Sequence, residues 1–311
     1  MPLITTPRRL LAALALFALA LTPASALACA CGCNIFDVGA DQMVAPNQKL
    51  SLSLEDDYLD QSHNWSGTSG SPSADNPDKE IRSDFVTLSA QYVINSDWSV
   101  SAQIPYWTRQ FRTLNNAGTT VDTFNHSALG DIRIMAQYSG FAPDRSTGIT
   151  FGVKTASGDS SYANFDRDTE IGSGSTDLLL GGYHAGSITE DSRATYFVRA
   201  LWDAPVTWRG GYRPGQEVAG ALGGRYLAVE QGKVRVAVVM QVLAQVRAKD
   251  TGPAADPVGS GYERVLAAPG LELDSGSWKL YGDIELPVYQ RINGNQLTAP
   301  GLFKLVMTRG F

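Results

Sequence analysis

The sequence predicts an all-β protein, folded as a 12-stranded antiparallel β-barrel of the type found in bacterial outer membranes. Three observations support this fold class. Apolar and polar residues alternate along many segments, long and short connections alternate between these segments, and aromatic residues gather at one end of them. Because lipid cannot hydrogen-bond the backbone, a closed sheet is the only β-structure that can span a membrane.

Alternation at every second residue identifies the strands, because successive side chains of a strand point to opposite faces. Val86, Leu88 and Ala90 alternate in this way with Thr87 and Ser89. No apolar run after residue 21 approaches the length of a spanning helix. The predicted strands are residues 48–59, 83–94, 98–108, 128–139, 147–155, 174–186, 194–204, 216–229, 234–247, 262–273, 278–290 and 297–311.

The connections between these segments differ in length. Five of them are long and polar, namely 60–82, 109–127, 156–173, 205–215 and 248–261. Others are tight turns, such as 95–97, 230–233 and 274–277, and the connection 291–296 is short where the pattern predicts a long one. Long loops at one end and short turns at the other are typical of outer-membrane barrels.

The charged residues of these segments fall on the face opposite to the apolar residues, which predicts a charged lumen. Glu263 is an exception, at the loop end of its strand. The charged residues predicted to face the lumen are Glu55, Asp131, Arg133, Lys154, Asp177, Arg199, Asp203, Arg225, Arg235, Arg247, Arg264, Glu272, Lys279, Asp283, Glu285 and Lys304.

The aromatic residues favour a membrane barrel over a soluble β-sandwich. A sandwich would also show alternation, but its aromatic residues would lie in a core. Here many aromatic residues alternate in phase with the apolar, lipid-facing residues and lie at the short-turn ends of the strands. This placement predicts a girdle at the periplasmic interface. Tyr106 and Trp202 are assigned to the opposite girdle. The predicted periplasmic girdle is Tyr92, Trp98, Tyr138, Tyr196, Tyr226, Trp278 and Phe311.

The first residues have the pattern of an export signal. Arg8 and Arg9 precede an apolar run over residues 10–21, and Ala26-Leu27-Ala28 is an A-x-A cleavage site. An uncleaved membrane anchor is the alternative. We therefore predict a signal peptide over 1–28, a cysteine-containing segment over 29–47 that could plug the lumen, and a barrel over 48–311, with the N-terminus in the periplasm and the long loops outside the cell.

Composition excludes several function classes. The net charge is −6 and no basic cluster is present, which argues against nucleic-acid binding. The three histidines, His63, His126 and His184, are too far apart in the sequence to form a multi-histidine metal site from neighbouring residues. The chain contains no GxxxxGK[ST], HExxH or CxxC motif.

A family resemblance follows from several motifs. These are Ile104-Pro105-Tyr106, Ala128-Leu129-Gly130-Asp131-Ile132, the run from Gly148 to Lys154 with Ser157-Gly158, and the run from Gly172 to Asp177. Over about residues 85–185 this order resembles the outer-membrane family labelled for the meta-pathway of phenol degradation. One departure is Thr155-Ala156, where the family tends to have a proline after the lysine. The resemblance implies a barrel and, by association, a channel for small organic compounds.

All three cysteines lie in one short stretch, Cys29-Ala30-Cys31-Gly32-Cys33. Three interpretations remain open: thiolate binding of Cu(I) or Zn(II), lipidation of Cys29, or a structural role with a disulfide and one further thiol. The first makes Cys29, Cys31 and Cys33 candidate metal ligands and favours a metal- or redox-linked outer-membrane protein. No other cofactor is predicted.

A lipid hydrolase is the enzymatic alternative, and we do not favour it. His126 and Ser127 lie beside a predicted strand near the extracellular interface, but adjacent residues of a strand point to opposite faces, so they cannot form a dyad without a bend. His184 has lipid parity near the periplasmic end, and the sequence shows no partner for it.

The preferred function is a passive outer-membrane channel for small, hydrophobic or aromatic molecules, without catalysis. Its predicted partners are membrane lipid, these solutes, and the insertion machinery, which in many barrels binds a C-terminal aromatic residue such as Phe311. Aromatic and charged lumen residues would set selectivity through weak sequential contacts. The candidates are Asp131, Arg133, Lys154, Arg199, Arg235, Arg264, Asp283, Glu285, Trp107 and Tyr281.

Overall fold

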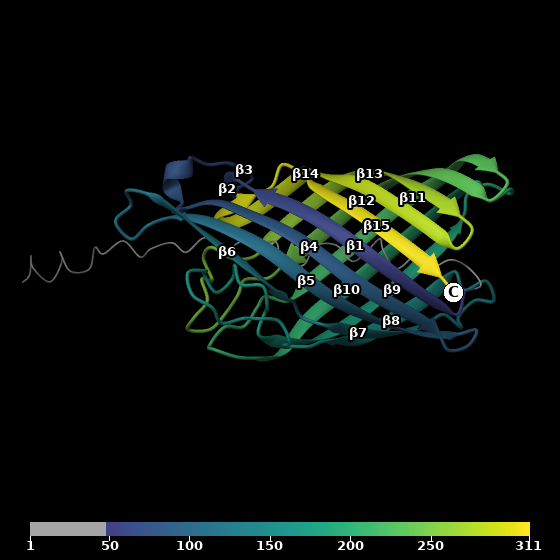
Figure 1. Cartoon of the computed structure of the whole chain (residues 1–311), viewed down its shortest axis with the longest axis horizontal. Helices are drawn as coiled ribbons and strands as arrows, with labels where there is room; N and C mark the ends of the chain where they lie inside the picture. Colours follow the sequence, from purple (N-terminus) through teal and green to yellow (C-terminus); the bar gives the residue numbers. More distant parts are fainter. Residues whose placement is uncertain (1–47) are drawn as a thin grey trace, which may run out of the picture.

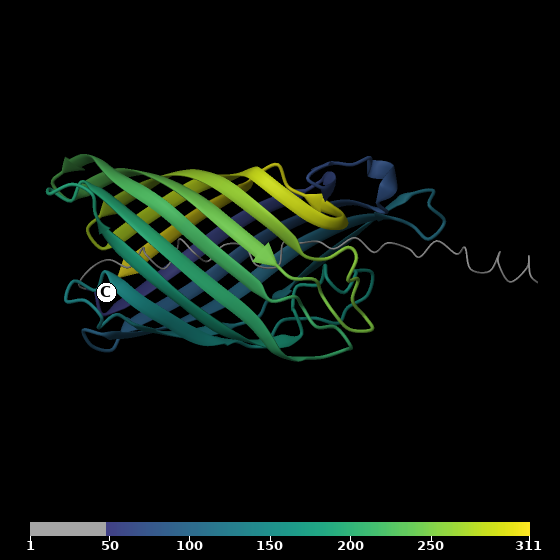
Figure 2. The same cartoon turned by 180° about the vertical axis from the view of Figure 1, so that it is seen from behind.

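The computed structural model describes residues 48–311, which form a closed antiparallel barrel of twelve strands (Figures 1 and 2). The predicted fold class is therefore confirmed. The predicted signal peptide (1–28) and cysteine segment (29–47) lie outside the described residues. The barrel strands are β1 (Leu50–Gln61), β4 (Asp78–Val93), β5 (Trp98–Leu114), β7 (Arg133–Tyr138), β8 (Thr147–Lys154), β9 (Ser175–Ser187), β10 (Ala194–Trp208), β11 (Glu217–Gln231), β12 (Val234–Arg247), β13 (Tyr262–Ser275), β14 (Trp278–Thr298) and β15 (Leu302–Gly310).

Each barrel strand pairs with its neighbours in the chain, and β1 pairs with β15 to close the ring. The closing register sets Glu55 opposite Val306 and Asp57 opposite Lys304. Closure removes the free edges that an open sheet of this size would leave in lipid. Within residues 48–311 no helix is long and apolar enough to cross a membrane.

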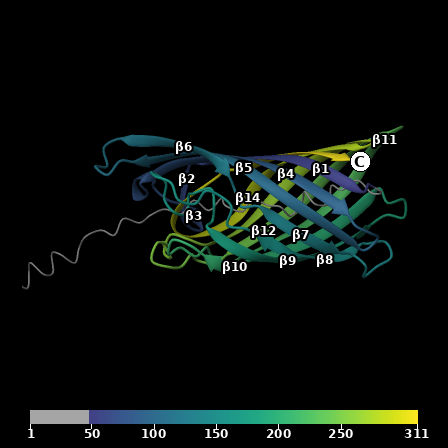
Figure 3. The same cartoon turned by 60° about the horizontal axis from the view of Figure 1, so that its bottom comes forward.

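The two ends of the barrel differ, and we call them the short-turn end and the long-loop end. At the short-turn end, two-residue turns join β11 to β12 and β13 to β14, with Gly232 and Gly276 in the left-handed region that such turns require. The long-loop end carries additional elements (Figure 3), namely β2 (His63–Gly67), β3 (Ser69–Gly70), a 3₁₀ turn η2 (Ser73–Asp75) and β6 (Val121–Leu129).

Several strands extend further at the long-loop end than the sequence predicts. β4 begins at Asp78, β5 continues to Leu114, and β14 includes the whole predicted connection 291–296. Strand β14 continues because its end pairs with β2. Residues 299–301 then form the short connection to β15, which begins at Leu302 rather than at residue 297.

The predicted strand 128–139 is wrong as a single element, because it is divided into β6 and β7 by residues 130–132. β6 pairs with the outer part of β5, and β7 pairs with β5 and β8. Pro105 of β5 lies opposite this interruption and has no N–H to donate to a ladder. A Cβ atom at Gly130 would lie 3.0 Å from the Pro105 ring, so glycine allows the close approach.

The two faces of the wall follow the predicted alternation. Large apolar side chains such as Leu88, Met240 and Leu305 are exposed on the outside, and charged side chains such as Lys154, Glu285 and Lys304 are buried inside. The assignment of charges to the lumen misses several exceptions, among them Asp56, Asp84 and Arg309. Asp56 and Asp84 face outward, and Asp56 lies between the exposed Val86 of β4 and Leu305 of β15.

Candidate functional site

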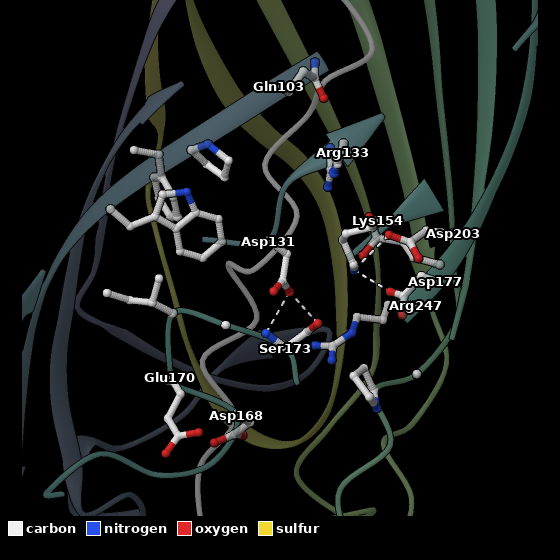
Figure 4. A pocket seen from close by; sticks show the side chains of 18 of the residues that line it. Gln103, Asp131, Arg133, Lys154, Asp168, Glu170, Ser173, Asp177, Asp203 and Arg247 are labelled. Atoms are coloured by element: carbon white, nitrogen blue, oxygen red, sulfur yellow. Dashed lines mark hydrogen bonds and ion pairs between the residues drawn. The ribbon is translucent and has the colours of Figure 1, made fainter. Parts of the chain in front are cut away.

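A cavity lies inside the barrel beneath the loops of the long-loop end (Figure 4). Side chains from β1, β4, β5, β7, β8, β9, β10, β11, β12 and β13 contribute to its lining. The loop between β8 and β9, residues 155–174, covers part of it, and we call this segment the lid loop.

One wall of the cavity is apolar and aromatic. Phe85 of β4 and Trp107 of β5 are opposite each other in the ladder, and both side chains point inward. Their rings meet edge to face, with centroids 4.5 Å apart. This geometry is favourable for two aromatic rings. Pro105 and Ile171 extend the apolar wall.

The opposite wall is charged. The Lys154 Nζ atom is 2.5 Å from Asp177 and 3.0 Å from Asp203, and all three side chains are buried. They come from the adjacent strands β8, β9 and β10, and Lys154 pairs with Asp177 in the ladder. Because a buried charge without a partner is costly, this arrangement holds two carboxylates in place through a single ammonium group.

Asp131, in the interruption between β6 and β7, contacts the lid loop near both of its ends, at Gly158 and at Ser173, and Figure 4 shows the contact with Ser173. Its Oδ1 atom accepts a hydrogen bond from the Gly158 N–H (2.9 Å). Its Oδ2 atom accepts hydrogen bonds from the Ser173 N–H (2.8 Å) and hydroxyl (2.5 Å). Ser157 adds a further contact, because its hydroxyl accepts a hydrogen bond from the Ile132 N–H. The lid loop therefore binds the wall where the strand ladder is broken.

Arg109 of β5 is the second anchor of the lid loop and is fully buried. Its guanidinium donates to the Ser83 hydroxyl (3.0 Å) and to the Thr169 carbonyl oxygen (2.5 Å). It also lies 5.5 Å from the centre of the Trp107 ring, within the range of a cation–π interaction. Arg109 thus connects the lid loop to the aromatic wall.

Acidic groups gather where the lid loop packs on the first residues of β4. Burial raises the pKa of Asp78 to about 7, and the nearby Asp166 carboxylate contributes to this rise. Burial also raises the pKa of Asp166. Burial raises the pKa of Glu170 as well, and the Arg167 guanidinium opposes that rise. We therefore expect protonation of these carboxylates to favour the packing of the lid loop on β4.

A second charged cluster lies at the β14–β15–β1 side of the lumen. The Lys304 Nζ atom is 2.6 Å from Glu55 and 3.1 Å from Asp57. Glu55 and Asp57 also line the main cavity. On β14, the Asp283 carboxylate accepts hydrogen bonds from the Tyr281 hydroxyl (2.6 Å) and from the Gln241 amide (2.9 Å).

The structure separates the predicted lumen residues into groups. Asp131, Arg133, Lys154 and Trp107 line the main cavity. Tyr281, Asp283 and Glu285 are buried on the side of Lys304. Like these three, the remaining three residues do not line the main cavity. Arg199 is buried in β10, and Arg235 pairs with Asp274 near the short-turn end. Arg264 donates a hydrogen bond to Gln245 and lies over the Tyr262 ring.

Sequence reasoning missed the lid-loop residues of the cavity. Arg167, Glu170 and Ile171 line it, although they belong to a segment without alternation. The only signal was the glycine- and serine-rich run around Gly172 and Ser173, which the family resemblance included.

The histidines have defined partners, and His126 and Ser127 do not form a dyad. His126 Nε2 is 2.9 Å from Asp159 and its ring stacks on Tyr162, whereas the Ser127 hydroxyl donates to Thr108. His184 hydrogen-bonds the Thr147 and Tyr196 hydroxyls, partners that the sequence did not reveal.

No cluster of three or more His, Cys, Asp or Glu side chains within residues 48–311 could hold a metal ion. Cys29, Cys31 and Cys33 lie outside the described residues, so Cu(I) or Zn(II) binding there remains a prediction.

No family model matches the chain, and no curated protein matches it. The resemblance to the phenol-degradation family therefore stays a prediction. Among solved structures, the COG4313 outer membrane channel from Pseudomonas putida F1 is similar, with a TM-score of 0.64 and 13% identity over 89% of this chain and 100% of that chain. The β domain of the Bordetella autotransporter BrkA gives a TM-score of 0.50 and 10% identity over 85% and 100%. At these identities the similarity shows the barrel fold alone.

Proposed function

We propose that the protein is an outer-membrane channel through which small hydrophobic or aromatic molecules pass without an energy source. The observation that carries this proposal is the cavity beneath the lid loop, with its Phe85–Trp107 wall, inside a barrel whose outer face is apolar. A ligand site that is largely apolar with a few placed polar groups suits such solutes. The similarity to a barrel described as an outer membrane channel agrees with this function.

The orientation in the membrane follows from the difference between the two ends. Outer-membrane barrels have short periplasmic turns and longer extracellular loops, so we assign the lid loop to the cell exterior. Trp98, Tyr226 and Trp278 are exposed on the outer face at the short-turn end, as an interfacial girdle requires. Phe311 is also exposed there, where insertion machinery could bind it.

The cavity lining favours neutral molecules over anions. Among the described residues that line it, eight are acidic and four are basic. An excess of carboxylates raises the free energy of an anion in the cavity, and the low dielectric constant of the protein interior strengthens the effect. We therefore propose uncharged aromatic compounds, rather than aromatic carboxylates or sulfonates, as the principal solutes.

The test uses a matched pair of dyes. The purified protein is inserted into vesicles with an outer leaflet of lipopolysaccharide, and the uptake of neutral N-phenylnaphthylamine and of anionic anilinonaphthalene sulfonate is followed by fluorescence. The protein should accelerate uptake of the neutral dye and leave the sulfonate unchanged. Trp107→Ala should lower the rate, while Trp202→Ala, which removes an exposed outward-facing ring, serves as the control. No acceleration of the neutral dye would exclude the proposed function.

A further inference from the structure

Four carboxylates surround a single lysine on the β14–β15–β1 side of the lumen. Asp57, Lys304 and Asp283 are paired across three adjacent strands, so their side chains form one row. Glu55 precedes Asp57 by two residues and contacts Lys304, and Glu285 follows Asp283 by two. With all groups ionised, one positive charge faces four negative charges. The carboxylates of this cluster therefore outnumber the cations near them within the described residues, which are Lys304 and Arg264.

The hydrogen bonds show the same shortage of donors. Asp283 Oδ2 accepts two hydrogen bonds, from Tyr281 and Gln241. Asp283 Oδ1, Gln241 Oε1 and both carboxylate oxygens of Glu285 are buried and accept no hydrogen bond from residues 48–311. All four atoms are acceptors, so a group that supplies several donors would satisfy them together.

Glu285 points most directly to a missing partner. Its side chain is 1% exposed, and within the described chain it forms neither a hydrogen bond nor an ion pair. Lys304, Asp283, Arg264 and Glu55 are the charged groups close enough to influence it. A buried carboxylate must be neutralised by a proton or by a cation. Residues 29–47 contain no Lys, Arg or His, so their side chains supply no cation.

The surroundings fit an organic cation better than a metal ion. No group of three acidic, cysteine or histidine side chains in residues 48–311 is arranged to hold a metal. A primary ammonium group carries three donors and one positive charge, which matches the acceptors of Glu285, Asp283 and Gln241. Leu302 pairs with Glu285 in the ladder and belongs to an apolar cluster with Leu59 and Leu266, so an alkyl chain would find apolar neighbours on that side.

We propose that Glu285, Asp283 and Gln241 form a binding site for the ammonium group of a primary alkylamine. This inference rests on the proposed function, because it assigns a substrate class to the same lumen: hydrophobic amines would pass in addition to neutral aromatics. Lys304 forms ion pairs with Glu55 and Asp57, so its charge is already shared by these two carboxylates. Glu285 and Asp283 remain as the carboxylates that receive the cation.

The experiment measures binding by calorimetry with the mature protein folded in detergent. The ligands are hexylammonium, hexanol and hexanoate, which share a chain and differ in the head group. Hexylammonium should bind at least about tenfold more tightly than hexanol, since hydrogen bonds to charged groups supply the difference, and hexanoate should bind least. Ammonium chloride tests the contribution of the chain and should bind more weakly than hexylammonium.

Glu285→Gln should reduce hexylammonium affinity about tenfold and leave hexanol unchanged, because it removes the charge and keeps the shape. Asp283→Asn is the second variant and should act in the same direction. Glu263→Gln is the matched control, since this carboxylate is half-exposed at the loop end of β13 and faces Arg291 at 3.8 Å. Folding of each variant is verified by its heat-modifiable migration on gels.

Two results would overturn the amine site. Equal binding of hexylammonium and hexanol, or unchanged hexylammonium affinity in Glu285→Gln and Asp283→Asn, would show that protons rather than an amine neutralise these carboxylates. Equal affinity for ammonium ion and hexylammonium would overturn the assignment to an alkylamine. If the protein fails to accelerate uptake of the neutral dye but still binds hexylammonium more tightly than hexanol, the proposed channel function is refuted and the amine site is retained.

Discussion

The two ends of the barrel solve different physical problems. At the short-turn end the strands alternate regularly, tight turns join them, and aromatic side chains lie on the outer face. At the long-loop end one strand is interrupted at Gly130–Ile132, the lid loop binds the interruption through Asp131, and charged residues are buried against each other. The structure of the first end suits contact with lipid, and the residues of the second end enclose a cavity. Removing contacts should therefore matter more at the long-loop end.

The largest effect is expected from Lys154→Met. The substitution leaves Asp177 and Asp203 buried without their shared ammonium group. Breaking a buried ion pair from one side costs about 3–5 kcal/mol of unfolding free energy. Denaturant unfolding in detergent measures the change. Adding Asp177→Asn and Asp203→Asn should recover most of the loss, and a triple variant as unstable as Lys154→Met would contradict the electrostatic explanation.

Asp131→Ala should have the next largest effect, on the lid loop rather than on the whole barrel. It removes three hydrogen bonds to a carboxylate that hold Gly158 and Ser173. Each such bond contributes about 1.5–3 kcal/mol, so the lid loop should detach and become sensitive to protease. Asp144→Asn, in a turn at the other end, should leave the cleavage rate unchanged. A lid loop that stays resistant in Asp131→Ala would show that Arg109 alone secures it.

A pH effect is expected at the same place. The pKa of Asp78 rises from its ordinary 3.8 to about 7 in the folded protein, with Asp166, Asp168 and Lys79 as the charged groups near it. The folded state binds the proton more tightly, so this stabilisation is complete below about pH 4 and is lost as the pH rises through 7. Protease cleavage of the lid loop should accelerate from pH 5 to pH 8, on either side of this pKa.

The control for the pH effect is Asp78→Asn, which cannot ionise. Its cleavage rate should vary much less with pH than that of the wild type. The same acceleration in Asp78→Asn would place the titrating group elsewhere.

The smallest effect is expected on the lipid face. Asp56 lies between the exposed apolar residues Val86 and Leu305. Asp56→Leu should raise the unfolding free energy by about 1 kcal/mol, because acidic groups on the lipid face of a barrel are moderately unfavourable. Unfolding in lipid vesicles measures it. Destabilisation would indicate that the Asp56 carboxylate has a partner that it needs.

The sequence predicts the short-turn end better than the long-loop end for a physical reason. Alternation and tight turns are local consequences of lipid on one face of the sheet. The strands could therefore be predicted from the sequence, and side chains such as Lys154 and Glu285 could be assigned to the lumen. The lid loop depends on contacts between Asp131 and Ser173, 42 positions apart, and no periodicity reports such a contact. The extension of β14 likewise requires β2, which is too short and polar to stand out.

The assignment of charges to the lumen left out Asp56 and Asp84, which alternate in phase with the outward apolar residues Leu54 and Val86. The two residues lie near each other on the adjacent strands β1 and β4. The alternation of apolar and polar residues alone does not predict that two carboxylates will face outward together.

The most direct test of the channel is to locate a solute inside it. Crystals of the protein grown with a brominated naphthalene would reveal the position of the bromine by anomalous scattering. We expect the bromine beside Phe85 and Trp107, beneath Ile171 of the lid loop. Bromine found only on the outer face of the barrel, with the cavity free of it, would contradict the claim that this cavity is the path of aromatic solutes.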